Sequence, residues 1–86
     1  MVKHTTPRRP LRTRLRQVLQ EHGCGDTQPE LLCVEAEVSL GSFYKWERGH
    51  SLPGSPQIFR LVHALRSITG ERDITVESLY VFEDAA

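Results

Sequence analysis

The chain has 86 residues, of which 38% are hydrophobic and 26% are charged, a composition that excludes a disordered chain and favours one small globular domain. The longest uninterrupted apolar run is Leu31–Val34, which is far too short to cross a bilayer, and no apolar segment follows the basic N-terminus as in a secretory signal. We therefore expect a soluble cytoplasmic protein with no membrane partner. The net charge of zero hides an asymmetry, because residues 1–20 carry six bases and no acid, whereas residues 21–86 carry five bases and all eleven acids.

Residues 1–9 are predicted to form a flexible basic arm, because they are polar and interrupted by proline. Arg8 and Arg9 in this arm, together with Arg12, are the candidate residues for binding phosphate groups. A basic segment of this kind is typical of phosphate binding, but the same charges also suit a merely solvated tail.

A first helix is predicted over residues 10–22. Pro10 suits the first turn, where its missing N–H has no partner to lose, and Gly23 is a natural stop. Apolar residues recur at helical spacing and would form the buried face: Leu11, Leu15, Val18 and Leu19.

A second, short helix is predicted over residues 28–36. Asp26 or Thr27 can cap it, and Pro29 falls in its first turn. Its expected apolar face consists of Leu32, Cys33 and Ala36.

A third helix is predicted over residues 39–48, beginning at a cap formed by Ser39 and ending before Gly49. Phe43 and Trp46 are three residues apart, so both side chains would face the core. Only two or three residues separate this helix from the preceding one.

A fourth helix is predicted to begin at Ser55 and Pro56 and to end at Gly70. Its expected buried stripe is Ile58, Phe59, Val62, Leu65 and Ile68. Beyond it, Thr75 can cap a short fifth helix, although the alternation of residues 76–82 suits a strand equally well. The predicted fold class is therefore all-α, a compact bundle of four to five short helices over residues 10–82, followed by an acidic tail at 83–86.

Two short helices joined by a tight turn, with another helix packed across them, form a helix-turn-helix unit that holds one helix at the surface. The third predicted helix is the candidate, because an α-helix fits the major groove of B-DNA. An ordinary solvated helix face is the alternative. The outer side of the third predicted helix carries hydroxyls, an amine and a glycine suited to base edges: Ser39, Leu40, Gly41, Ser42, Tyr44 and Lys45.

The segment Tyr44-Lys45-Trp46-Glu47-Arg48-Gly49 stands at the end of this helix, in a stretch that also has Gln28, Leu32, Val38, Ser39, Phe43 and Pro53 at matching positions. Residues 27–65 thereby resemble the Cro/C1-type (XRE family) helix-turn-helix repressors. The resemblance implies a lambda-repressor-like fold and a sequence-specific transcriptional regulator, a repressor that binds a palindromic double-stranded DNA operator as a homodimer. It also assigns base-reading roles to the outer residues named above.

By the same resemblance, further residues would bind the DNA backbone: Gln28, Arg48, His50 and Ser51. The sequence departs from the family at three positions. Cys33 replaces a small alanine, and Glu37 replaces a turn glycine, which predicts strain if the position needs positive φ. Leu19 stands where an arginine often pairs with the residue matching Glu47.

The C-terminal segment is apolar for a chain end and is predicted to form a dimer seam, to seal the core, or to do both. The expected dimerisation residues are Val76, Leu79, Tyr80 and Phe82. A second candidate function uses the same segment and the same helical fold as an antitoxin or a protein-docking module.

Enzymatic chemistry is not expected. Ser42, Glu47 and His50 lie close together in sequence, but no nucleophile elbow or glycine-rich phosphate loop accompanies them. The four histidines and two cysteines match no zinc-ligand spacing. We therefore predict no catalytic residue, no metal, no cofactor and no small-molecule ligand.

Overall fold

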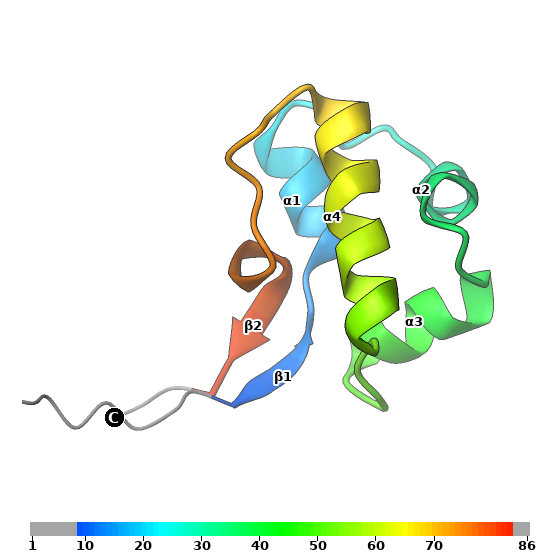
Figure 1. Cartoon of the computed structure of the whole chain (residues 1–86), viewed down its shortest axis with the longest axis vertical. Coiled ribbons are helices and arrows are strands. Elements are labelled where there is room, and N and C mark those ends of the chain that lie inside the picture. The colour runs from blue at the N-terminus through cyan, green and yellow to red at the C-terminus, as the bar shows by residue number, and fades with distance from the viewer. Residues whose placement is uncertain (1–8, 84–86) are drawn as a thin grey trace, which may run out of the picture.

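The computed structural model describes residues 9–83, so most of the predicted basic arm, including Arg8, and most of the acidic tail lie outside the described residues. The described part is mostly helical and carries a short two-stranded sheet (Figure 1). In chain order its elements are β1 (Pro10–Thr13), α1 (Leu15–Glu21), α2 (Pro29–Ala36), α3 (Leu40–Arg48), α4 (Ser55–Thr69), the 3-10 helix η1 (Glu77–Leu79) and β2 (Tyr80–Phe82). None of its helices has the length and apolar character that crossing a bilayer requires.

The predicted helix over residues 10–22 is wrong in its first turn, because residues 10–13 form β1 and α1 begins only at Leu15. β1 pairs in antiparallel fashion with β2, with Thr13 opposite Tyr80 and an irregularity between Pro10 and Arg12. Leu11, predicted to be buried on a helix face, is 47% exposed on the strand. The local apolar spacing was compatible with a helix, but pairing with a strand at the other end of the chain overrides it.

For residues 76–82 the sequence suits either a short helix or a strand, and each interpretation is correct for part of the segment. Residues 77–79 form the single turn η1, and residues 80–82 form the strand β2. The prediction of a strictly all-α domain is therefore wrong, although the coarser expectation of a mostly helical domain with four α-helices is confirmed.

α4 passes through the middle of the domain, with α2 and α3 on one side of it and the sheet on the other (Figure 1). Its buried residues are Ile58, Leu61, Val62, Ala64 and Leu65. Phe59 was predicted to belong to this stripe but is 55% exposed, because it is offset by about 100° around the helix from Ile58. Leu61 takes its place and is fully buried.

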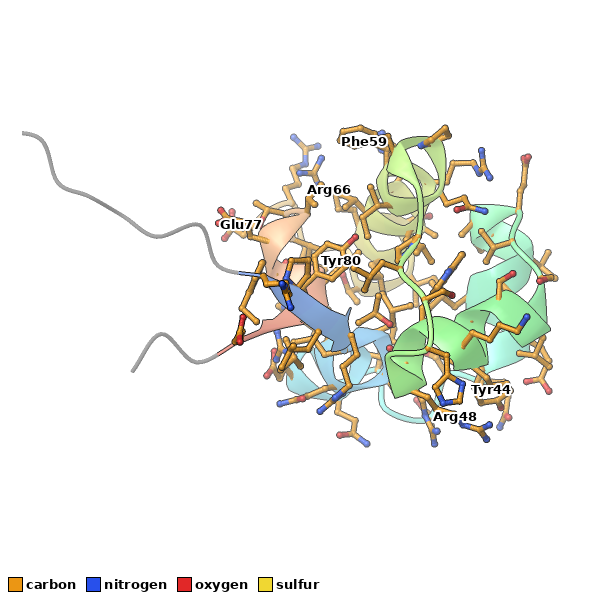
Figure 2. The ribbon with its side chains drawn as sticks, turned by 90° about the horizontal axis from the view of Figure 1, so that it is seen from below. Tyr44, Arg48, Phe59, Arg66, Glu77 and Tyr80 are labelled. Carbon is orange, nitrogen blue, oxygen red and sulfur yellow. The ribbon has the colours of Figure 1, made fainter. Side chains whose placement is uncertain are left out.

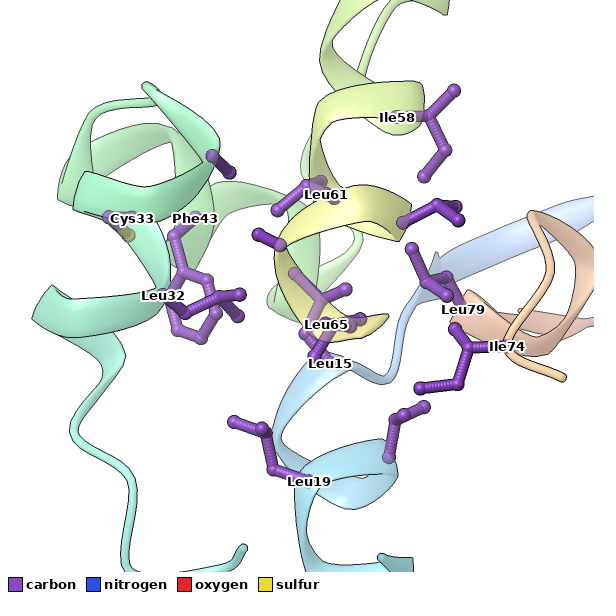
Figure 3. Packing of buried hydrophobic residues seen from close by; sticks show 14 of the residues in the cluster. Leu15, Leu19, Leu32, Cys33, Phe43, Ile58, Leu61, Leu65, Ile74 and Leu79 are labelled. Atoms are coloured by element: carbon purple, nitrogen blue, oxygen red, sulfur yellow. The ribbon is translucent and has the colours of Figure 1, made fainter. Parts of the chain in front are cut away.

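The core joins all four helices to the C-terminal segment (Figure 3). Phe43 of α3 and Leu32 of α2 pack into it from one side, and Ile74 and Leu79 close it from the other. Leu79 is fully buried, so its predicted place in a dimer seam is wrong for this fold, and the alternative role of sealing the core is correct for this residue. Val76, Tyr80 and Phe82 remain partly exposed.

The short connection between α2 and α3 contains a strained residue. Glu37, at the C-terminal cap of α2, has φ 57° and ψ 45°, the left-handed conformation that a side chain disfavours. The strain expected from its replacement of a turn glycine is therefore present. Arg60 stabilises the same helix end, because its Nε donates to the carbonyl oxygen of Ala36 at 3.0 Å.

Replacing Glu37 with glycine is expected to raise the free energy of unfolding by about 0.5–1 kcal/mol, because relief of the left-handed strain exceeds the greater entropy of glycine in the unfolded chain. Glu35→Gly is the matched control: it lies inside α2 with helical geometry and should lower the same quantity by about 1 kcal/mol. Urea denaturation followed by circular dichroism measures both. Changes of the same sign in the two variants would contradict the prediction.

The two cysteines differ in environment. Cys33 is 4% exposed, and its thiol pKa is raised, first by burial and second by the carboxylate of Glu30, whereas Cys24 is only half-buried. Since the thiolate is the reactive form, Cys33 should react much more slowly at pH 8 than Cys24.

Single-cysteine variants, Cys24→Ser and Cys33→Ala, permit each rate to be measured with a chromogenic disulfide reagent. Urea should abolish the difference, since unfolding removes both the burial and the neighbouring charge. Equal rates in the folded protein would show that Cys33 is accessible.

Candidate nucleic-acid interface

α2 and α3 are joined by residues 37–39, and α3 presents one side to the core and the other outward. Phe43 is fully buried and Trp46 is 3% exposed, so both hold α3 to the core, as the sequence predicts. The helix predicted over residues 39–48 is confirmed as α3 with Ser39 at its N-cap. Its outer side is therefore a rigid, solvent-facing helix surface.

The six residues predicted to read bases all lie on α3 or at its cap. Ser39, Gly41 and Lys45 are exposed, whereas Leu40, Ser42 and Tyr44 are partly buried. Leu40 and Tyr44 also pack against the core cluster. The fold thus brings the whole predicted set to one helix and leaves every member at least partly accessible.

The two serines at the start of α3 have different hydrogen bonds. Ser39 Oγ accepts the backbone N–H of Ser42 at 3.1 Å and donates its own proton to Ser42 Oγ at 2.8 Å. The hydroxyl of Ser39 is thereby occupied at the helix cap. Ser42 keeps its own hydroxyl proton, which is suited to an acceptor such as a purine N7 or a phosphate oxygen.

Further along α3, the ring of Tyr44 meets the ring of Phe43 edge to face, with centroids 5.2 Å apart. The guanidinium carbon of Arg48 lies 5.9 Å from the centroid of the Tyr44 ring, within cation–π range. The two side chains lie next to each other at the outer edge of α3 (Figure 2).

β1 brings a second basic residue to the same end of α3. A Cβ atom placed on Gly49 would lie 2.8 Å from the carbonyl oxygen of Leu11 and 3.5 Å from Cβ of Arg12. The strand and the end of α3 are therefore in direct contact, and the exposed Arg12 stands close to the residue that follows Arg48. His50 and Ser51, in the loop after α3, are exposed as well.

Glu47 is the residue whose role the sequence analysis left unresolved, because Leu19 stands where an arginine partner was expected. One of its carboxylate oxygens accepts from the hydroxyl of the buried Thr13 at 2.5 Å and from the N–H of Leu15 at 2.9 Å. The other accepts from the N–H of Arg16 at 3.5 Å. Glu47 thus caps α1, which has no side-chain cap of its own, and locks it to α3.

Three other arginines hold the fold together. Arg14 donates to the carbonyl oxygen of Ser78 at 2.8 Å and pairs with Glu21, and Arg66 donates to the carbonyl oxygen of Ile74 at 2.9 Å. Arg60 donates to α2, as described above. These guanidinium groups are therefore engaged within the protein, and the predicted phosphate ligands do not include them.

Gln28, predicted to bind phosphate, is exposed at the N-cap of α2. It borders a shallow hollow that is also lined by Arg16, Gln20, Asp26 and Thr27. Arg16 was not predicted as a phosphate ligand, because the sequence separates it from Gln28 by a whole helix and loop. In the fold Arg16 lines the same hollow as Gln28 and Pro29 at the positive end of α2, where an anion is favoured.

Comparisons with protein-family models, with curated proteins and with solved structures each returned no match for this chain.

Proposed function

We propose that this protein is a sequence-specific DNA-binding transcriptional regulator of the Cro/C1 helix-turn-helix type, acting in the cytoplasm. The observation that carries the proposal is the geometry of α3: its back is fixed by the buried Phe43 and Trp46, while its front is open and polar. A helix held in this way fits the major groove, where every base pair shows a distinct pattern of donors and acceptors.

In this function the outer side of α3, including Ser42 and Lys45, meets base edges, and the surrounding groups bind phosphates. Ser42 and Lys45 are the donors best placed for base contacts, since Ser42 retains its hydroxyl proton and Lys45 is exposed. Gln28 and Arg16 at one end, with Arg12 and Arg48 at the other, would bind the backbone on either side of the groove. Phosphate contacts set position and affinity, whereas base contacts set specificity.

A single unit of this size buries a small DNA surface, which limits affinity, and a two-fold symmetric homodimer doubles that surface. The partly exposed Val76, Tyr80 and Phe82 are the side chains proposed for the seam. A dimer bound over a promoter would act as a repressor by excluding polymerase from the site.

Selection of bound sites from a random double-stranded DNA pool, followed by gel-shift titration of the selected operator and of random DNA, tests this function. Lys45→Ala should weaken operator binding by roughly 5- to 100-fold and change random-DNA binding much less. Arg12→Ala should weaken both DNAs alike and flatten the dependence of affinity on salt.

Arg72→Ala is the matched charge control, because Arg72 is exposed in the loop after the C-terminal end of α4, away from α3 (Figure 1). It should leave both affinities unchanged apart from a small effect of net charge. Failure to enrich any sequence would refute the regulator function and favour the protein-docking alternative.

A further inference from the structure

We infer that Tyr44 is a positioning residue for Arg48, whose guanidinium binds a DNA phosphate, and that Tyr44 does not read a base through its hydroxyl. The inference rests on the proposed DNA-binding function and concerns how the same interface is organised. It reassigns Tyr44 from the base-reading residues to the backbone-binding ones.

The first support is the restraint on the Tyr44 ring. Phe43, which is fully buried, meets the ring edge to face at 5.2 Å, and Tyr44 itself packs against the core cluster. A side chain held by these contacts has few rotamers to lose on binding. Its face is therefore a fixed platform at the surface of α3.

The second support is the state of the Arg48 guanidinium. Among residues 9–83 this guanidinium takes part in no hydrogen bond or ion pair. It lies over the Tyr44 ring, with its central carbon 5.9 Å from the ring centroid. Arg14, Arg60 and Arg66, by contrast, donate to backbone carbonyls. Stacking on a ring leaves the planar edge of a guanidinium free, and that edge matches two oxygens of one phosphate.

The third support is position along the helix. Arg48 is the last residue of α3, about two and a half turns from the cap at Ser39, and Arg12 on β1 lies at the same end. Base contacts in helix-turn-helix units come from the N-terminal residues of the reading helix, and the opposite end lies toward the backbone. Two cations at this end suit a phosphate better than a base edge.

A double-mutant cycle on the selected operator tests the inference, with Kd measured over a range of salt concentrations. The variants are Tyr44→Phe, Tyr44→Leu, Arg48→Gln and the double variant Tyr44→Leu/Arg48→Gln. Arg48→Gln should weaken binding and reduce the salt slope by about one phosphate contact. Tyr44→Phe keeps the ring and should match the wild type, whereas Tyr44→Leu should weaken binding by about two- to fivefold, the strength of an exposed cation–π contact.

The coupling between the Tyr44 and Arg48 substitutions distinguishes a positioning role of Tyr44 from a structural role or a direct contact with DNA. If Tyr44 acts through Arg48, adding Tyr44→Leu to Arg48→Gln causes no further loss of affinity and no further change in salt slope. Independent, multiplicative losses would overturn the inference, as would a loss in Tyr44→Phe equal to that in Tyr44→Leu, which would identify the hydroxyl as the working group.

Thermal denaturation of each variant checks that the fold is retained, and Tyr44→Phe, which removes only an oxygen, remains informative if Tyr44→Leu does not fold. A wild-type protein that selects no DNA refutes the proposed function and the inference together. A wild-type protein that selects an operator, combined with an uncoupled cycle, refutes the inference alone.

Discussion

Replacing Phe43 with alanine is expected to lower the free energy of unfolding by about 3–5 kcal/mol, the usual range for truncating a buried phenylalanine. Phe43 is completely buried in the hydrophobic core, so its removal leaves a cavity that the packed neighbours fill only in part. A domain of this size has a total stability of only about 5–10 kcal/mol. The variant should therefore be close to unfolding at 37 °C.

Urea denaturation followed by the fluorescence of Trp46, the single tryptophan, measures this change. Phe59→Ala is the matched control, because it makes the same chemical change at a side chain that is 55% exposed. The control should lower the free energy of unfolding by no more than about 1 kcal/mol. Similar losses in the two variants would show that Phe43 does not anchor α3.

Replacing Glu47 with alanine is expected to lower the free energy of unfolding by about 2–4 kcal/mol. The change leaves the buried hydroxyl of Thr13 and the N–H of Leu15 without their acceptor, and each such group carries a penalty of about 1–3 kcal/mol. It also removes a carboxylate from the positive end of α1. Glu47→Gln keeps one acceptor oxygen and should lose less.

Glu35→Ala controls for the loss of a charge, because Glu35 is exposed on α2, and it should change stability by less than about 0.5 kcal/mol. Thr13→Val, which removes only the hydroxyl, should be coupled to Glu47→Ala in a double-mutant cycle, since the two groups share one hydrogen bond. Additive losses would contradict the capping role of Glu47.

The helices that sequence patterns located well are those with strong local signals at both ends. α3 begins at the Ser39 cap and ends at Gly49, whose φ of 78° suits glycine, and α4 ends at Gly70 with φ 75°. The cap predicted for α2 at Asp26 or Thr27 is wrong, because Gln28 is the N-cap residue and makes no side-chain cap bond. Its first-turn Pro29 nevertheless placed the helix within a residue.

The residues of the candidate interface also differ in whether the sequence alone could locate them. The positions of the outer residues of α3 could be assigned from the sequence, because residues on one face of one helix follow from a local period: Ser39, Leu40, Gly41, Ser42, Tyr44 and Lys45. Arg12 was predicted as a phosphate ligand, but its place beside the end of α3 could not be worked out, and Arg16 was not predicted at all. Each position depends on which distant segment lies beside the residue: the end of α3 for Arg12 and the start of α2 for Arg16.

The sequence by itself determined the lengths of α2, α3 and α4 and the inner faces of α2 and α3, because caps, proline, glycine and apolar spacing act over a few neighbouring residues. Only the tertiary structure decided that residues 10–13 are a strand, that Leu79 is core and that Glu47 caps α1. Each of these outcomes requires a partner more than thirty residues away, as Thr13 and Tyr80 illustrate. Local preferences are worth less than about 1 kcal/mol per residue, and long-range pairing and burial outweigh them.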